Sequence, residues 1–288
     1  MRVLRLKDTS PDTPQAIALG YFDGGHTGHA ALIRKTVSEA RRTGCESAVF
    51  SFSHLPTKGG APLCTESDRL AFFEKLGIEN VILADFDEVK GLSPEAFVEE
   101  ILVSRLSCRL ALCGFNFRFG HKAVGDSDLL CRLLPESVVL PPTVYKDAPV
   151  SSTRIREALA LGALEDANAM LGRPYTLSGR VLHGRALGRA LGFPTANIVT
   201  PLFVPRYGVY KTEVGVDGVL YRGLTNVGVR PSVADRGDIS IETFLPDFSG
   251  DLYGKELSLS LLAFLREERR FASLDALKAQ MNEDLKLL

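Results

Sequence analysis

The sequence predicts two domains of different class, an α/β domain with a parallel sheet followed by a mainly antiparallel β domain. At 288 residues the chain exceeds the usual length of a single domain. In the first part, short apolar runs alternate with amphipathic stretches, whereas after about residue 172 strand-like runs follow one another. We therefore expect domains at residues 1–172 and 173–288.

The first domain begins with two β-α units. An apolar run at 16–19 precedes an amphipathic helix over about 29–42, which Gly44 is expected to end, and a second run at 48–52 precedes a helix that opens at Thr65. Thr65 is followed three residues later by Asp68, the spacing of a capping box. Both units have the order strand, connection, helix.

Two further strands continue this alternation. A strand is expected at 81–86, a helix begins where Ser93 precedes Pro94, and another apolar run lies at 110–113. Such alternation favours a parallel sheet covered by helices on both faces, with ligands bound beyond the carboxyl ends of the strands. Segment 20–29 lies at such an end.

The second domain is predicted from runs typical of β-strands. Asp217-Gly218 separates two of these runs and indicates a hairpin, because a type I′ turn needs positive φ at both central positions. A closing helix is expected after Ser273, and two helices at 152–161 and 165–171 are expected to bridge the domains. The expected strands lie around 181 and at 209–216, 219–222, 239–244 and 257–264.

Composition excludes several classes of protein. Hydrophobic residues make up 45% and charged residues 24% of the chain, and the formal net charge is -1, so there is no basic field that would attract nucleic acid. No apolar run is long enough to span a bilayer, and residues 1–10 do not resemble a signal peptide, which predicts a cytoplasmic protein without a membrane partner. The five cysteines lack the spacing of a zinc site and are expected to be reduced thiols; the oligomeric state is left open.

A glycine-rich turn with two histidines follows the first strand. Glycines in this segment allow close backbone approach, the amides at a helix start favour an anion, and His26 and His29 could stabilise charge that develops on a phosphate. The pattern alone also fits a plain connection between strand and helix. The expected binding residues are Gly20, Phe22, Asp23 and Gly28.

A second candidate element spans residues 151–156. Ser151, Ser152 and Thr153 offer hydroxyl groups at a helix start, where Arg154 and Arg156 are unfavourable unless an anion binds nearby. Solvated arginines are the alternative interpretation. With an anion, the segment would be a second phosphate contact.

The second domain begins with a glycine-rich basic stretch over 183–197. Such a loop suits nucleotide phosphates, and Thr195 with Asn197 offers hard oxygen atoms for Mg²⁺ bound together with ATP. A rigid Gly/Pro turn between strands is the alternative. The expected binding residues in this stretch are Gly184, Gly188, Arg189, Gly192, Pro194, Thr195 and Asn197.

Other candidates have ordinary explanations from pattern alone. Glu242 on an alternating strand fits a solvated face, and Phe115, Phe117 and Phe119 fit a core or a platform for a planar ligand. The charge run formed by Arg266, Glu267, Glu268 and Arg270 is expected to be an exposed face.

These motifs together resemble the bacterial bifunctional riboflavin kinase/FAD synthetase family. Residues 20–29 and 151–156 are similar to motifs of its adenylyltransferase module. The sequence Gly-Phe-Pro-Thr-Ala-Asn at 192–197 matches the riboflavin kinase signature without gaps, and 226–231 and 247–255 are similar to two further kinase motifs. The resemblance implies a Rossmann-like nucleotidylyltransferase domain followed by a six-stranded antiparallel β-barrel kinase domain with a closing helix.

The resemblance also implies roles for individual residues. Glu242 would be the general base that activates riboflavin, and Thr195 and Asn197 would bind Mg²⁺ with ATP. His26, His29 and Arg156 would serve the transfer of an adenylyl group to FMN, giving FAD. Asn226, Arg230, Asn116 and Phe117 would contribute to binding, the last two on the flavin side.

Three positions depart from the family pattern. Tyr21 stands where the family usually has Asn, His54 is displaced by one position from a Pro-His-Pro motif, and Asn116 replaces the usual Asp. Two alternatives follow: a riboflavin kinase whose adenylyltransferase module has decayed, and a flavin-binding regulator without turnover.

Overall fold

The computed structural model describes residues 1–53, 60–182, 193–229, 239–269 and 271–288. The chain forms two compact units. One comprises Met1–Lys58 with Thr65–Ser151, and the other comprises Gly59–Cys64 with Ser152–Leu288. The predicted domain boundary between residues 172 and 173 stays a prediction.

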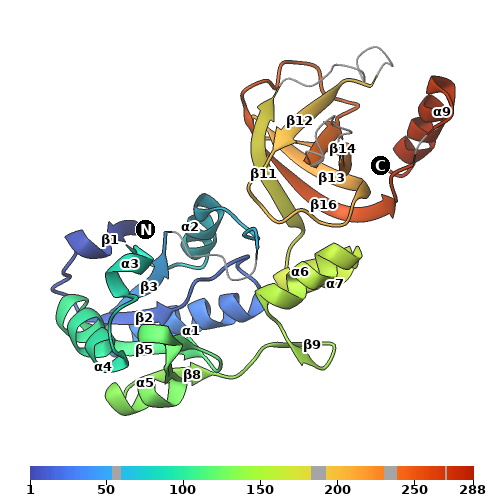
Figure 1. Cartoon of the computed structure of the whole chain (residues 1–288). Helices are drawn as coiled ribbons and strands as arrows, with labels where there is room; N and C mark the ends of the chain where they lie inside the picture. Colours follow the sequence, from blue (N-terminus) through green and yellow to red (C-terminus); the bar gives the residue numbers. More distant parts are fainter. Residues whose placement is uncertain (54–59, 183–192, 230–238, 270) are drawn as a thin grey trace. The chain divides into compact units, whose positions relative to one another are not determined.

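The first unit is built on a six-stranded sheet in which every neighbouring pair is parallel (Figure 1). The strand order is β1-β4-β3-β2-β5-β8. The strands are β1 (Arg2–Arg5), β2 (Gln15–Leu19), β3 (Glu46–Phe52), β4 (Asn80–Ala84), β5 (Cys108–Gly114) and β8 (Val138–Leu140). This arrangement confirms the predicted parallel sheet.

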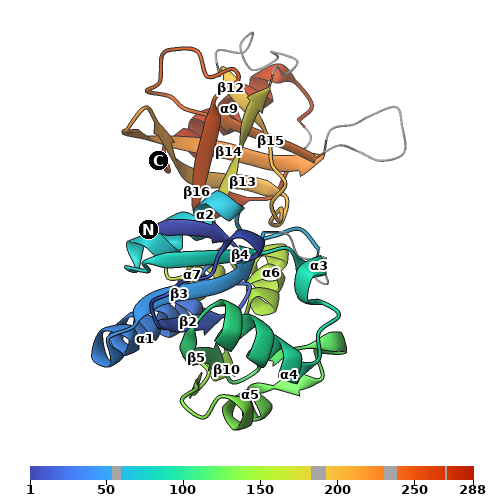
Figure 2. The same cartoon turned by 90° about the vertical axis from the view of Figure 1, so that its left-hand side faces the viewer.

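Helices cover both faces of this sheet (Figure 2). Successive residues of β2 point to opposite faces: Ile17 packs in the core on one side, whereas Ala16 and Ala18 pack in the core on the other. Ile33 of α1 and Phe73 of α2 belong to the second of these cores. The helices are α1 (Thr27–Thr43), α2 (Glu66–Lys75), α3 (Phe86–Val89), α4 (Pro94–Ala96), a π-helical continuation over Phe97–Arg105, and α5 (Ser127–Leu133).

Local sequence signals place the ends of these helices where expected. Thr65 and Asp68 form both bonds of the predicted capping box at the start of α2. Gly44 ends α1 in the left-handed conformation, with φ 69°, and Ser93 caps α4 by accepting from the Ala96 amide. The unit also contains two short 3-10 turns, Leu6–Asp8 and His121–Ala123, and two small ribbons, β6 (Arg118–Phe119) with β7 (Gly125–Asp126) and β9 (Val144–Tyr145) with β10 (Ala148–Pro149).

Three features of this unit differ from expectation. Strands β1 and β8 and helix α5 were not predicted, and the expected strand 81–86 ends at Ala84 because Asp85 caps helix α3, which begins at Phe86. Strand β1 has only two apolar residues, Val3 and Leu4, between two arginines at an exposed sheet edge, so the sequence contains no apolar run that marks it as a strand.

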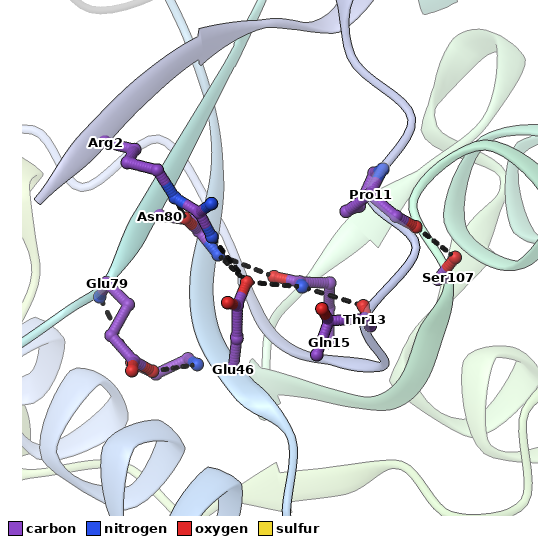
Figure 3. A network of polar contacts seen from close by, with 9 residues as sticks. Arg2, Pro11, Thr13, Gln15, Glu46, Glu79, Asn80 and Ser107 are labelled. Carbon is purple, nitrogen blue, oxygen red and sulfur yellow. Dashed lines mark hydrogen bonds and ion pairs between the residues drawn. The ribbon is translucent and has the colours of Figure 1, made fainter.

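A polar network closes the amino-terminal edge of the sheet (Figure 3). Asn80 donates to Gln15 (3.0 Å) and to Glu46 (2.8 Å), and Arg2 donates to Glu46 (2.6 Å). Gln15 and Asn80 are buried, so these bonds satisfy side chains that would otherwise be costly to bury. The network joins the starts of four strands. The bonds from Asn80 and Gln15, together with the charge of Arg2, lower the pKa of Glu46.

The second unit contains a closed six-stranded barrel in the order β11-β12-β15-β14-β13-β16, with every neighbouring pair antiparallel (Figure 1). Asn168 of α7 anchors that helix by accepting from the Tyr175 amide and donating to the Leu261 carbonyl. The elements are α6 (Ser152–Leu161), α7 (Leu164–Leu171), β11 (Tyr175–Leu182), β12 (Thr195–Val199), β13 (Gly208–Val216), β14 (Val219–Val229), β15 (Ile239–Phe244), β16 (Glu256–Arg266) and α9 (Leu274–Leu285).

The barrel confirms the predicted antiparallel domain with its closing helix. Asp217 and Gly218 both have positive φ in the hairpin between β13 and β14, as expected. Strand β12 was not predicted, because Pro194 and the preceding glycines indicate a turn, and β14 extends seven residues beyond the expected end at Arg222. A row of buried hydroxyls, Thr212, Thr225 and Thr243, is hydrogen-bonded across β13, β14 and β15 at 3.0 and 2.9 Å.

Helix α9 is held to the barrel by an ion pair. Arg266 donates to both carboxylate oxygens of Asp284, and the two side chains are 13% and 5% exposed. The expectation that the whole charge run 266–270 forms an exposed face was therefore wrong at Arg266, whereas Glu267 and Glu268 are exposed. Arg270 lies outside the described residues.

Candidate active sites

The two histidines of the glycine-rich turn lie against each other at the start of α1. His26 is the N-cap of this helix, and its Nδ1 accepts from the His29 backbone N–H at 3.2 Å. The imidazole rings stack with centroids 3.5 Å apart and planes 15° apart. This bond requires that Nδ1 of His26 carry no proton, so a neutral His26 has its N–H at Nε2. The pair occupies the carboxyl end of β2, where the first domain was expected to bind its ligand.

Packing around the pair leaves little freedom. Phe22 is buried with φ 63°, and its ring meets His29 edge-on at 5.2 Å and Phe73 edge-on at 5.3 Å. An alanine Cβ at Gly28 would lie 3.2 Å from Cε1 of His26, so the predicted glycine permits the histidine to pack on the helix start. Asp23 is also buried. Packing therefore fixes the positions of the two histidines at the N-terminus of α1.

The second predicted phosphate element is divided between the units. Ser151 ends the first unit, and Ser152 and Thr153 begin α6 in the second. Arg156 donates from Nε to the Ala61 carbonyl at 3.2 Å, and both Arg154 and Arg156 are half-buried. Their predicted phosphate contacts stay predictions.

The aromatic segment after β5 separates into two environments. Phe117 and Phe119 stack with centroids 5.6 Å apart and pack on the core, as the ordinary interpretation predicted. Phe115 is 45% exposed, and Asn116 is exposed beside it. The two exposed side chains are accessible to a ligand, and the binding roles expected for Asn116 and Phe117 stay predictions.

In the barrel, three polar side chains share one row across the strands. Glu242 of β15 pairs with Asn197 of β12 on one side and with Asn226 of β14 on the other. Because directly paired residues point to the same face, the carboxylate stands between two amides. Thr195 donates to Oε2 of Glu242 at 3.3 Å, and Ser240 donates to Oε1 at 3.0 Å. Glu242 is half-buried, so its predicted solvated alternative does not describe it.

A cavity of about 330 Å³ opens at the start of β12, and its lining includes Thr195, which donates to Glu242, but not Glu242, Asn197 or Asn226 themselves. Its lining includes Pro194 and Thr195 at the start of β12, and Phe248 with Tyr253 from the segment after β15. Oxygen donors and an aromatic wall therefore meet in one pocket.

The sequence did not predict the contact that Glu268 makes with this row. Asn226 donates from Nδ2 to Oε1 of Glu268 at 2.9 Å. An alanine Cβ at Gly228 would lie 1.9 Å from the same oxygen, so Gly228 leaves the space that the carboxylate fills. The signal was a glycine within a strand, at the next-to-last residue of β14, because such a glycine often marks a close approach.

Several predicted residues lie outside the described part of the chain. They are Gly184, Gly188, Arg189, Gly192, Arg230 and the displaced His54. Within the described part, no group of three or more His, Cys, Asp or Glu side chains could hold a metal by itself. A cation held here would therefore take other oxygen ligands as well.

The cysteines are free thiols, as the sequence predicted. All five cysteines are free, and burial raises the pKa of Cys108 and of Cys113 to about 12. Cys64 is also buried, whereas Cys45 and Cys131 are half-buried.

No helix of the described residues combines the length and apolarity needed to cross a membrane.

The parallel α/β unit with stacked histidines at a helix start and the closed barrel with a carboxylate between amides match the two modules expected from the sequence for a transferase acting on phosphate groups. Comparisons with known proteins give the family. A family model described as FAD synthetase matches residues 8–154, and one described as riboflavin kinase matches residues 171–288. The chain belongs to the bifunctional riboflavin kinase/FMN adenylyltransferase family.

Individual relatives are similar in sequence to this chain over nearly its whole length. The chain is 38% identical to a bifunctional riboflavin kinase/FMN adenylyltransferase of Pseudomonas fluorescens, with 99% of this chain and 96% of the relative covered. It is 33% identical to one of Listeria monocytogenes, with 96% and 92% covered. A crystal structure of a Streptococcus pneumoniae protein described as a macrolide-efflux protein is similar with a TM-score of 0.90 and 27% identity, covering 99% and 98% of the chains.

Proposed function

We propose that the chain phosphorylates riboflavin with ATP to give FMN and then transfers an adenylyl group from ATP to FMN to give FAD. The observation that carries this proposal is that each compact unit holds its own polar cluster of the required chemistry. The row around Glu242 serves the first reaction, and the stacked histidines serve the second. The names of the relatives that this chain matches over nearly its whole length support both activities.

In the kinase step, Glu242 takes the proton of the ribityl 5′-hydroxyl. The freed oxygen attacks the γ-phosphorus of ATP, the bond between that phosphorus and the bridging oxygen breaks, and ADP leaves. The hydroxyls of Thr195 and Ser240 hold the carboxylate in place through bonds of 3.3 and 3.0 Å. Asn197 and Asn226 flank it and provide amide groups for the substrates.

The donor set of this row fits a magnesium ion bound with ATP. The Thr195 hydroxyl and the Asn197 amide oxygen are hard ligands, and Mg²⁺ is usually held by few protein oxygens together with substrate phosphates. When bound, the ion would neutralise charge on the phosphates. The residues that would hold it are Thr195 and Asn197.

In the adenylyl step, a phosphate oxygen of FMN attacks the α-phosphorus of ATP, the bond to the bridging oxygen breaks, and pyrophosphate leaves. His26 and His29 stabilise the charge that develops on the phosphate oxygens, together with the amides at the start of α1. Arg154 and Arg156 add positive charge in this proposal.

The alternative of a decayed adenylyltransferase module rests on Tyr21 and His54. The ring of Tyr21 stacks against the Arg69 guanidinium, 4.6 Å from its centroid, and the histidine pair keeps its stacked geometry. The departure at Tyr21 is therefore accommodated locally. The flavin-binding regulator has no observation in its favour.

Assays of the two half-reactions test the proposal separately. Riboflavin with ATP and Mg²⁺ should give FMN and ADP, and supplied FMN with ATP and Mg²⁺ should give FAD and pyrophosphate. FMN without FAD would support the decayed module, and turnover of neither substrate would support the regulator. A cytoplasmic location belongs to the same proposal, and cell fractionation checks it.

A further inference from the structure

Arg69 carries a buried positive charge behind the histidine turn. It lies in the first turn of α2 and is 3% exposed. Positive charge near a helix N-terminus opposes the helix dipole, and a buried charge without a counter-ion costs stability. Across the part of the chain that the structure describes, no carboxylate lies within ion-pair distance of its guanidinium.

The guanidinium instead holds the carboxyl ends of two neighbouring strands. Nη1 donates to the Tyr21 carbonyl at 2.9 Å, just after β2, and Nη2 donates to the Phe52 carbonyl at 2.9 Å, at the end of β3. Ser51 donates to the same Tyr21 carbonyl at 3.1 Å. The Tyr21 ring lies against the guanidinium, which adds a cation-π contact. The start of the turn is therefore fixed from both sides.

From this anchor, a continuous series of contacts leads to the histidines. Phe22 follows Tyr21 directly and has φ 63°, a conformation that a bulky side chain rarely adopts unless its surroundings hold it. Its ring meets His29 edge-on at 5.2 Å, and His29 stacks on His26 at 3.5 Å. A movement of the Tyr21 carbonyl would shift Phe22 and with it the pair.

We propose that Arg69 is a positioning residue of the adenylyltransferase site, which fixes the histidine pair through Tyr21 and Phe22. This inference rests on the proposed second activity of the chain. Replacement of Arg69 should lower the rate of adenylyl transfer more than the affinity for ATP, because misplaced histidines lose contacts that strengthen in the transition state.

The test compares Arg69→Met and Arg69→Lys with Asn80→Ala. Asn80 is buried in the same unit, in the polar network at the opposite edge of the same sheet (Figure 3), so its truncation reports general destabilisation. For each purified full-length variant, kcat and KM for ATP are measured with supplied FMN at several temperatures below the unfolding transition. The folded fraction is taken from a thermal unfolding curve, and FMN formation serves as a control in the other unit.

Per folded molecule, we expect Arg69→Met to lower the kcat of FAD formation at least about tenfold, which corresponds to about 1.4 kcal/mol of activation free energy. The KM for ATP should change less than about threefold. Arg69→Lys should recover part of the loss, and Asn80→Ala should keep the wild-type kcat. Equal kcat for Arg69→Met and Asn80→Ala per folded molecule would overturn the inference. Absence of FAD formation in the wild type would instead overturn the proposed activity itself.

Discussion

Replacement of Glu242 by Gln is expected to remove FMN formation and to leave the adenylylation of supplied FMN unchanged. The amide has nearly the volume of the carboxylate but cannot accept the proton of the ribityl hydroxyl. Glu242 belongs to the barrel unit, whereas His26 and His29 belong to the parallel-sheet unit. The two activities should therefore separate.

The size of the effect follows from the role of the carboxylate. A positioned general base contributes roughly 10²- to 10⁴-fold to a rate, which corresponds to about 2.7–5.4 kcal/mol of activation free energy. The hydroxyls of Thr195 and Ser240 would each exchange a bond to a carboxylate for one to an amide. This change costs about 1–3 kcal/mol of folding stability, because bonds to charged groups are the stronger ones. We expect the barrel to stay folded at 25 °C.

The assay follows FMN and FAD by chromatography under saturating ATP and Mg²⁺, with Glu256→Gln as the matched control. Glu256 lies at the exposed start of β16 in the same barrel, so the same substitution there tests the chemistry of the change without the site. A kcat for FMN formation within threefold of the wild type in Glu242→Gln would refute the general-base role. Loss of both activities would refute the separation of the two sites.

Three further predictions follow from the geometry. His29→Ala should lower FAD formation from supplied FMN at least about 10²-fold, the loss typical of a removed transition-state donor, with FMN formation unchanged in the same preparation. Gly228→Ala should displace the Glu268 carboxylate from Asn226 and lower kcat/KM for riboflavin about two- to fivefold, since a contact of an exposed charged group is worth about 0.2–1 kcal/mol; an unchanged kcat/KM would show that this contact has no part in binding. Glu46 has a lowered pKa in the folded chain, so its contribution is fully present above the unfolded value of about 4.3 and disappears as the pH falls through the lower folded pKa. The difference in urea stability between wild type and Glu46→Gln should therefore be constant well above about pH 4.3 and shrink as the pH falls through the lower folded pKa of Glu46, and a pH-independent difference would contradict this assignment.

The sequence predicted the parts of the fold that local chemistry determines. The capping box of Thr65 and Asp68, the left-handed Gly44 and the turn at Asp217-Gly218 all lie where they were expected. In each case, a short segment contains both the signal and its partner. The apolar alternation of strands and helices likewise predicted the parallel sheet, because its strands are buried on both faces.

Features that depend on distant partners were not predicted. Strand β12 was not expected, because Pro194 and the glycines before it indicate a turn, whereas pairing with β11 and β15 decides its conformation. Arg69 was overlooked, since an arginine on a helix usually reaches solvent and its acceptors lie up to 48 residues away in the sequence. The partnership of Glu268 with Asn226 spans 42 residues. Tertiary packing, which the pattern does not contain, decides all three.

The candidate site residues likewise include some that the local sequence indicated and some that it did not. Residue types and spacing suggested His26, His29, Thr195 and Asn197, and the structure places the first two in contact and the last two beside Glu242. Glu242 itself has no distinctive local pattern, and only the family motifs indicated it. Its neighbours Ser240 and Asn226 become meaningful once the strand register is known.

The most direct test of the central claim is a time course of the purified wild-type protein with riboflavin, ATP and Mg²⁺ in one reaction. If one chain holds both activities, FMN should appear first and FAD should follow as FMN accumulates, with ADP and pyrophosphate formed in step. FMN that rises to the full amount of riboflavin without any FAD would contradict the claim of two working sites.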